Sequence, residues 1–521
     1  MIQQKCNCFL KHYLNTRHTH RTMPFILINN SIYFLIKFIL NSHNKTMMVN
    51  ERRKMYMKKF MLLFLNFLLC IFLVACNNNV EETNTTTLED ETQTQSQTEV
   101  ETSTSYLTKD DITINETINN DQDGEHAIIA DNESLSYANV MVTKTGEADG
   151  DEADFYGENA AVFATNGGSL DLSDMVIETN GTHANAVFSY GEGTTVNISD
   201  SYITTDGNCS GGIMTTGGGT MNANNLTIHT TGRSSAAIRS DRGGGIVTVN
   251  KGSYTTEGSG SPAIYSTADI TVNDALLQSK AAQGVVVEGK NSVTLNNVEL
   301  IADNNTKNSD KSDYFQAVMI YQSMSGDADV GTSSFEMNDG SITNKNGDIF
   351  FVNNTVTTIN LKNVIINNED LEGVFLRACA AGWGSEGSNG GQVTLNASKQ
   401  TIDGTILVDE VSNLNLYLKE TSSFTGTINP DGQAGEVYVE LDNDSKWTLT
   451  ADAYITSLTC QAGSIDLNGH TLYINGVAYD GNSSTGEAIE AVVSSSGNHD
   501  GSTPPGKPDG NPQGGEPPKK P

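Results

Sequence analysis

Short runs of alternating apolar and polar residues occupy most of the chain between about residues 125 and 400. Within each run, apolar side chains take every second position over three to five residues, and Gly, Asn, Asp and Ser separate one run from the next. A period of two is typical of a strand that buries one face, so each run predicts a short β-strand.

The runs themselves recur about every 25 residues. In the first run of each period, a small residue precedes a β-branched one, which lies at positions 162, 187, 213, 238, 264 and 286. Two more runs follow, as with Leu170/Leu172 and then Val176/Ile177 in the first period. Three short strands per coil of about 25 residues predict an all-β parallel β-helix, with at least nine coils stacked between about 125 and 400.

A polar turn after the second run supports this prediction. Asp174, Asp200 and Asn225 end such turns, and Asn and Asp tolerate left-handed backbone and can stack as ladders between coils. In outline, residues 111–400 resemble the right-handed β-helix of the pectate-lyase-like superfamily, which implies a fold but no activity. The Trp-x-Asp-His and Arg-x-Pro-x-x-Arg motifs expected of pectate lyases are absent from the sequence.

The region after residue 400 has a different pattern. Residues 445–469, which include SKWTLT and IDLNG, resemble the repeat of autotransporter adhesin passenger domains. That resemblance implies an extracellular β-solenoid up to about residue 480. A low-complexity segment rich in Pro and Gly follows at 481–521 and predicts a disordered tail, where such a family would continue into a membrane barrel.

Residues 57–76 read MKKFMLLFLNFLLCIFLVAC, a short basic start followed by an apolar run. This pattern predicts an export signal at 57–75, too short and wrongly flanked for a transmembrane helix. Its end resembles the lipobox of bacterial lipoproteins, which implies cleavage before Cys76, a lipid on the Cys76 sulfur and display on the outer face of the cell membrane. The alternative is a plain secretory signal with an incidental cysteine. Residues 1–56 precede this signal and are interpreted as an over-extended start of the protein sequence.

Composition narrows the possible partners. Residues 76–110 are rich in Thr and Glu and predict a flexible tether. After residue 75 there are 19 basic and 62 acidic residues, a net charge near −43, which argues against nucleic acid and against polyanionic glycans without bridging cations. Cys209, Cys379 and Cys460 are too far apart to suggest a disulfide framework or a zinc motif.

One column of the first strands is a candidate ligand-binding surface. It follows the β-branched position and contains, in order, Phe163, Phe188, Met214, Arg239, Tyr265, Val287 and Met319. If the β-branched column faces the core, alternation places this one outside, where aromatic rings can stack on sugar rings. The alternative is that the aromatic side chains point inward and stack in the core.

Insertions interrupt the coils at two recurrent turns. Residues 322–333 and 378–391 follow the first strand, and the second of them carries Trp383 among glycines, a candidate clamp for a ligand. Residues 145–158 and 302–314 follow the third strand. Asp149, Asp151 and Asp154 in the first of these acidic loops can supply oxygens to Ca²⁺, although such loops are usually only solvated.

Three functions fit these features. We expect a lipid-anchored surface protein that acts in adhesion or binds a polysaccharide or a host or cell-surface glycan. The first alternative is a polysaccharide lyase or glycoside hydrolase on the same fold, which needs an arginine-plus-carboxylate cleft; only Arg233, Arg239 and Arg242 cluster in the sequence. The second alternative is a structural envelope protein without a ligand. The scarcity of basic residues favours a protein that is not an enzyme.

Overall fold

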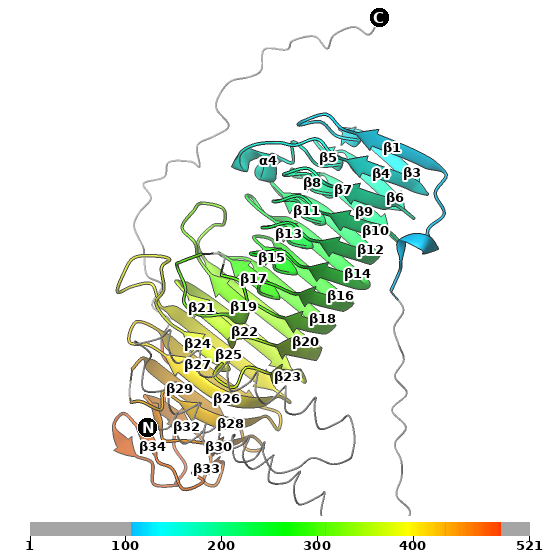
Figure 1. Cartoon of the computed structure of the whole chain (residues 1–521). Helices are drawn as coiled ribbons and strands as arrows, with labels where there is room; N and C mark the ends of the chain where they lie inside the picture. Colours follow the sequence, from blue (N-terminus) through cyan, green and yellow to red (C-terminus); the bar gives the residue numbers. More distant parts are fainter. Residues whose placement is uncertain (1–105, 308, 433, 491–521) are drawn as a thin grey trace, which may run out of the picture. The chain divides into compact units, whose positions relative to one another are not determined.

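The computed structural model describes residues 106–490 apart from 308 and 433, and this part of the chain is a stack of parallel strands (Figure 1). Its hydrogen-bonded sheets have 18, 14 and three strands, here called sheets A, B and C. Ten strands of sheet B lie between residues 128 and 378, each paired in parallel with the next. The predicted parallel β-helix and its minimum of nine coils are therefore confirmed.

Sheet B takes one strand from each coil. Its strands are, in order, β2(Ile128–Asp131), β5(Val162–Thr165), β8(Val187–Tyr190), β11(Ile213–Thr216), β13(Ile238–Ser240), β15(Ile264–Ser266), β17(Val285–Glu288), β19(Gln316–Tyr321), β21(Asp348–Asn353), β24(Leu376–Ala378), β26(Thr401–Val408), β28(Ser423–Ile428), β30(Lys446–Leu449) and β33(Ile465–Asp466).

Sheet A takes the other two runs of each coil. Its strands are β1(Glu116–Asn120), β3(Ser134–Ala138), β4(Val140–Lys144), β6(Ser169–Ser173), β7(Val176–Thr179), β9(Thr195–Ser199), β10(Tyr202–Thr205), β12(Gly219–Thr230), β14(Gly245–Thr256), β16(Asp269–Ser279), β18(Ser292–Ala302), β20(Thr332–Asn344), β22(Thr355–Lys362), β23(Ile365–Asn368), β25(Gly391–Ser398), β27(Asn413–Lys419), β29(Glu436–Leu441) and β32(Ser457–Thr459). Sheet C contains β31(Ala453–Ile455), β34(Leu472–Ile474) and β35(Val477–Ala478).

The main core lies between sheets A and B. The β-branched column of sheet B is fully buried there, from Val162 to Ile264. The next member is Val285 and not Val286, because Ile264 pairs with Val285 across β15 and β17. The spacing between these two coils is therefore one residue shorter than the sequence suggested. The candidate ligand-binding column, which follows the β-branched position, accordingly contains Val286 in place of the predicted Val287.

The predicted polar turns are present as single left-handed residues. Asp174, Asp200 and Asn225 have φ values of 52°, 47° and 55°. From β12 to β20 the second and third runs form one long strand that bends at this residue. Next to the bend, the side chains of Asn250, Asn273, Asn296 and Asn338 form a ladder with N···O distances of 2.8–3.0 Å. This ladder holds successive coils in register.

Lys251 lies at the same bend in β14 with φ 61°, where most other coils have Asn or Asp. A left-handed conformation costs an ordinary L-residue about 1–2 kcal/mol, and Asn tolerates it better. We expect Lys251→Asn to raise the free energy of unfolding by about 1 kcal/mol, measured by chemical denaturation. The control is Lys362→Asn, at an exposed extended position that ends β22. Equal effects of the two changes would contradict this explanation.

The solenoid continues past residue 400, as predicted, with strands up to Ala478. Phe424 and Trp447 stack in the core with ring centroids 5.5 Å apart. The predicted tail begins at residue 481, but residues up to 490 return to the last coils: Ile489 and Asn415 exchange hydrogen bonds of 2.8 and 2.9 Å. Asn415 and Ile489 thus connect the start of the predicted tail to the solenoid, and residues 491–521 lie outside the described part of the structure.

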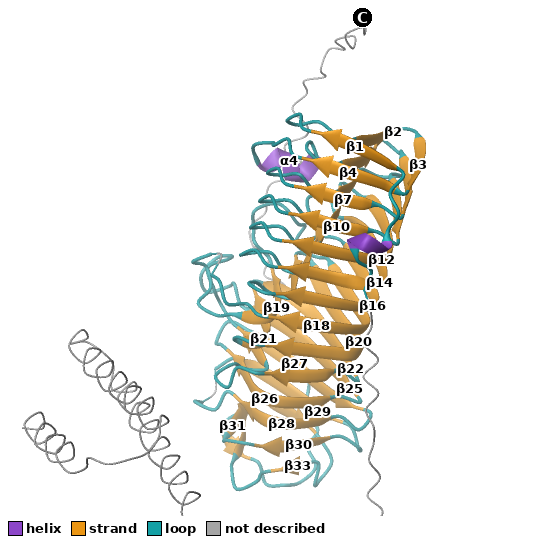
Figure 2. Cartoon of the chain, turned by 45° about the vertical axis from the view of Figure 1, so that its right-hand side comes forward, coloured by secondary structure: helices purple, strands orange, loops and turns teal. Residues whose placement is uncertain are grey.

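Insertions gather beside sheet B, at one side of the stack (Figure 2). Residues 145–161 contain the short helix α4(Asp151–Tyr156), and the other helical element of the described residues is the 3-10 turn η1(Lys109–Asp111). The loops between β18 and β19, β19 and β20, and β24 and β25 are the other predicted insertions. No helix within 106–490 has both the length and the apolar character needed to cross a membrane.

Candidate functional site

The predicted aromatic column lies on the outer face of sheet B, but most of it is covered. Phe163, Phe188 and Met214 form a small apolar cluster separate from the main core. Phe188 is 0% exposed and Phe163 is 6% exposed. These side chains point away from the main core, as predicted. The rings of Phe163 and Phe188 are nevertheless buried, so the prediction that they are exposed is wrong. The alternative, stacking within the main core, is wrong as well.

The 145–161 insertion buries these rings. Gly157 lies so close that an added Cβ would come within 2.8 Å of the Phe163 ring, and its φ of 72° also favours glycine. His126 stacks on the other side of Phe163 at a centroid distance of 4.5 Å. Because alternation within strands says nothing about loops that fold back, this cover was not predictable from the strand pattern.

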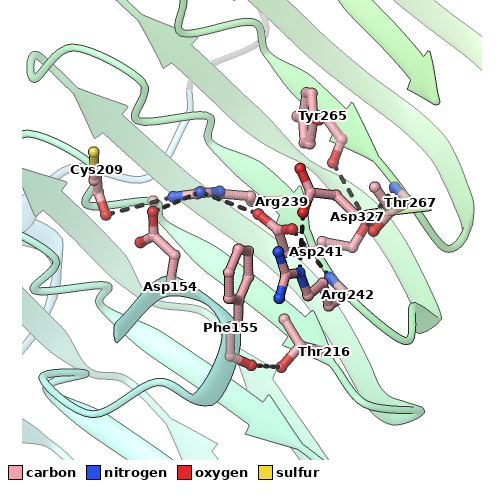
Figure 3. Close-up of polar contacts among 12 residues, drawn as sticks. Asp154, Phe155, Cys209, Thr216, Arg239, Asp241, Arg242, Tyr265, Thr267 and Asp327 are labelled. Carbon is pink, nitrogen blue, oxygen red and sulfur yellow. Dashed lines mark hydrogen bonds and ion pairs between the residues drawn. The ribbon is translucent and has the colours of Figure 1, made fainter. Parts of the chain in front are cut away.

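Farther along the same face, Arg239 is the centre of a buried charged cluster (Figure 3). Its guanidinium lies 2.9 Å from Asp154 of helix α4 and 3.3 Å from Asp241, two residues farther along the chain. Its Nη1 also donates a hydrogen bond to the carbonyl oxygen of Cys209 at 3.4 Å. The other carboxylate oxygen of Asp154 lies 3.0 Å from Nδ1 of His183. A buried arginine thus shares its charge between two carboxyl groups.

The two carboxyl groups have opposite pKa shifts. Burial raises the pKa of Asp241 to about 7, and Arg239 only partly offsets this while Asp327 and Asp154 raise it further. The pKa of Asp154 is lowered, because Arg239 and His183 outweigh its burial. Asp154 is therefore the ionised partner of Arg239, and Asp241 exchanges its proton near neutral pH.

A second polar cluster adjoins the first. Glu288 is fully buried and accepts hydrogen bonds from the hydroxyl groups of Tyr265 at 2.5 Å and Tyr321 at 2.8 Å. Burial and the nearby carboxylates keep the pKa of both tyrosines well above the usual value, so they stay neutral donors. Arg242 lies 3.8 Å above the Phe155 ring and pairs with Asp327 at 3.0 Å, which joins helix α4 to the 322–331 loop.

These clusters lie at three separate clefts along sheet B, which share lining residues and are here together called the groove. One cleft of about 510 Å³ lies over Arg239, Asp241 and Arg242. It shares Tyr265 and Tyr321 with a second cleft that reaches Trp383, and this one shares Tyr314 with a third at Arg377. Arg239 and Arg377 are five coils apart in the strand register, roughly 24 Å at about 4.8 Å per coil.

Trp383 lies at the middle of this groove. Its ring packs edge-on against Tyr321 at 5.1 Å and remains half-buried. Its loop is held to the neighbouring insertion by a hydrogen bond of 2.7 Å from the Gly382 amide to the Lys311 carbonyl. At the far end, Arg377 pairs with Asp348 at 2.6 Å beneath the ring of Tyr314. The predicted clamp residue therefore lines the groove as part of an ordered wall.

Two of the three aspartates predicted to bind Ca²⁺ lie in different environments. Asp149 is exposed, and Asp154 is buried against Arg239 and His183. The backbone of Asp151 begins helix α4, and its side chain lies outside the described part of the structure. Ca²⁺ binding by this loop stays a prediction. The lipidation site Cys76 and the export signal also lie outside the described residues.

Several groove residues were not identified from the sequence. Asp241 lies two residues after Arg239 on the same outward face. Glu288 and Tyr321 follow the same alternation in later coils, where Glu288 pairs with Tyr321 across β17 and β19. A search for charged residues two positions after the predicted column would have found Asp241, whereas Glu288 lies two positions after Val286, the member that the structure places in the column. Asp154 reaches Arg239 only through the fold of the insertion.

No protein-family model matches the chain, and neither a curated protein nor a solved structure matches it. The site is therefore interpreted from its own geometry.

Proposed function

We propose that this protein binds a polysaccharide in the groove along sheet B, outside the cell. The observation that carries the proposal is the row of adjoining clefts that Tyr265, Tyr321, Trp383 and Tyr314 line. Aromatic rings along an extended cleft suit the C–H faces of successive sugar rings. Neutral hydrogen-bonding side chains from the 303–315 loop, such as Thr306 and Ser312, line the same cleft and suit sugar hydroxyl groups.

The charges of the groove favour a neutral polymer. Each of its arginines is paired with aspartate: Arg239 with Asp154 and Asp241, Arg242 with Asp327, and Arg377 with Asp348. None of these guanidinium groups is left to neutralise a uronate, and the chain after residue 75 is strongly negative. Binding of a neutral polysaccharide should therefore depend little on salt, whereas a polyuronate should need a bridging cation.

We expect the double variant Trp383→Ala/Tyr314→Ala to bind an insoluble neutral polysaccharide roughly 20- to 30-fold more weakly than the parent. Each ring contributes about 1 kcal/mol by stacking, and both are accessible, with Tyr314 42% exposed. The measurement is depletion from solution over a panel of neutral glucans, mannans and chitin. Tyr417→Ala is the control, since Tyr417 is a half-buried aromatic residue on sheet A.

The melting temperature of the double variant should stay within a few degrees of the parent value. If the parent binds no member of the panel, or if the control loses as much affinity as the double variant, the groove is not a polysaccharide site.

Cleavage of the bound polymer is a second candidate, favoured by one observation. Arg239 and Asp241 form the arginine-plus-carboxylate arrangement that an enzyme of this fold needs, and the carboxyl group of Asp241 keeps a proton close to neutral pH. The same incubations distinguish the two functions. New reducing ends or unsaturated products that vanish in Asp241→Asn indicate an enzyme, and an intact polymer indicates a binding protein.

A further inference from the structure

Three potential metal ligands converge at the edge of the Arg239 cluster. Within the described residues, the one group of three such side chains comprises Asp154, His183 and Cys209, whose ligand atoms all lie within 4.8 Å of one another. They come from three separate segments: helix α4 and the turns that precede β8 and β11. Nothing in their sequence spacing indicates a metal motif.

Stacking of the coils explains why two of them meet. His183 and Cys209 occupy the same left-handed turn position in successive coils, with φ values of 57° and 54°. The His183 amide donates a hydrogen bond of 2.9 Å to the carbonyl of Asn208, next to Cys209. The two side chains therefore start about one coil spacing apart, roughly 4.8 Å. The 145–161 insertion then brings Asp154 over both.

The donor atoms have the geometry and burial that a metal ion requires. Asp154 Oδ1 and His183 Nδ1 are buried 3.0 Å apart, and apart from this mutual contact neither atom has a hydrogen-bond partner among the described residues. Ligands bound tetrahedrally at about 2.1 Å for nitrogen or oxygen and 2.3 Å for sulfur lie roughly 3.4–3.6 Å from one another. Shifts of an ångström or less would bring all three onto one ion.

Neighbouring groups support such a site. Arg239 donates to the other oxygen of Asp154, which orients that carboxylate as second-shell partners do in metal sites, and it also donates to the main-chain carbonyl of Cys209. A thiolate and a carboxylate together balance the charge of a divalent ion. Asp154 and Cys209 also line the 510 Å³ cleft, so a further position on the ion would open into the groove.

We propose that Asp154, His183 and Cys209 bind a divalent transition metal ion, with Zn²⁺ the best match to one sulfur, one nitrogen and one oxygen ligand. Binding releases the proton of the Cys209 thiol to solvent. The site is independent of what the groove binds.

The experiment titrates purified, tag-free protein, reduced and freed of metal, with Co²⁺ and then Zn²⁺. Co²⁺ reports thiolate coordination by a sulfur-to-metal charge-transfer band in the near ultraviolet, and Zn²⁺ should displace it. We expect one equivalent to bind, and both Cys209→Ser and His183→Asn to weaken binding at least tenfold. Asn is chosen because it tolerates the left-handed turn.

Cys379→Ser is the matched control, since Cys379 is also a half-buried cysteine on the sheet B side. Zn²⁺ should raise the melting temperature of the parent and of the control, and not that of Cys209→Ser. The proposal is overturned if the charge-transfer band is absent, if it persists in Cys209→Ser, or if it disappears in the Cys379 control. Melting temperatures without metal show whether each variant is folded.

Discussion

Replacement of Arg239 by methionine is expected to lower the free energy of unfolding by about 3–5 kcal/mol near pH 8. Methionine keeps much of the volume of the arginine side chain but carries no charge. Asp154 would therefore stay buried without its cation. Removal of one partner from a buried ion pair is far more costly than removal of the whole pair. The measurement is chemical denaturation in the presence of a chelator, which removes any contribution from bound metal.

Two comparisons make this result specific. Arg233→Met, at an exposed position in the turn that precedes β13, should change the free energy of unfolding by less than about 0.5 kcal/mol. The double variant Arg239→Met/Asp154→Asn should recover part of the loss, since no buried charge is then left alone. A loss below about 1 kcal/mol in Arg239→Met, or a double variant less stable than the single one, would show that the cluster is not a stabilising ion pair.

The second large effect concerns pH. The stability of the parent should fall as pH rises from about 4 to about 7, relative to Asp241→Asn. The pKa of Asp241 is raised from 3.8 to about 7 in the folded protein, so between these values the folded state holds a proton that the unfolded state has lost. The stability contributed by protonated Asp241 is complete below its pKa in the unfolded chain. It is lost as pH rises to its pKa in the folded protein. Above that pH it stays constant.

The size of the effect follows from the shift. One pKa unit corresponds to about 1.4 kcal/mol, so the difference between parent and Asp241→Asn should change by a few kcal/mol across this range. Asparagine keeps the shape of the protonated carboxyl group and cannot ionise. We expect Asp241→Asn to be the more stable protein near pH 8 and to lose that advantage near pH 4. Denaturation curves measured across the range test this, and parallel pH dependences would contradict the raised pKa.

The coil architecture was predictable from local pattern because it repeats. The column from Val162 to Ile264 and the left-handed turns from Asp174 to Asn225 each recur once per coil. Every coil packs on a neighbour of nearly the same sequence pattern, so local preference and tertiary contact agree. The one register error, at Val285, arose where a shorter coil broke the spacing.

Strand alternation also identified the outer face of sheet B and two residues that line its groove, Arg239 and Tyr265. It could not show that Phe188 is covered, because a loop of another coil supplies the cover. It could not show either that Asp154 pairs with Arg239, 85 residues away, or that His183 and Cys209 face the same point. The repeating sequence determined the coils and which face of each strand is outward, since these depend on neighbours in the chain. The tertiary structure alone decided which outward residues meet, because the insertions that fold over sheet B do not repeat.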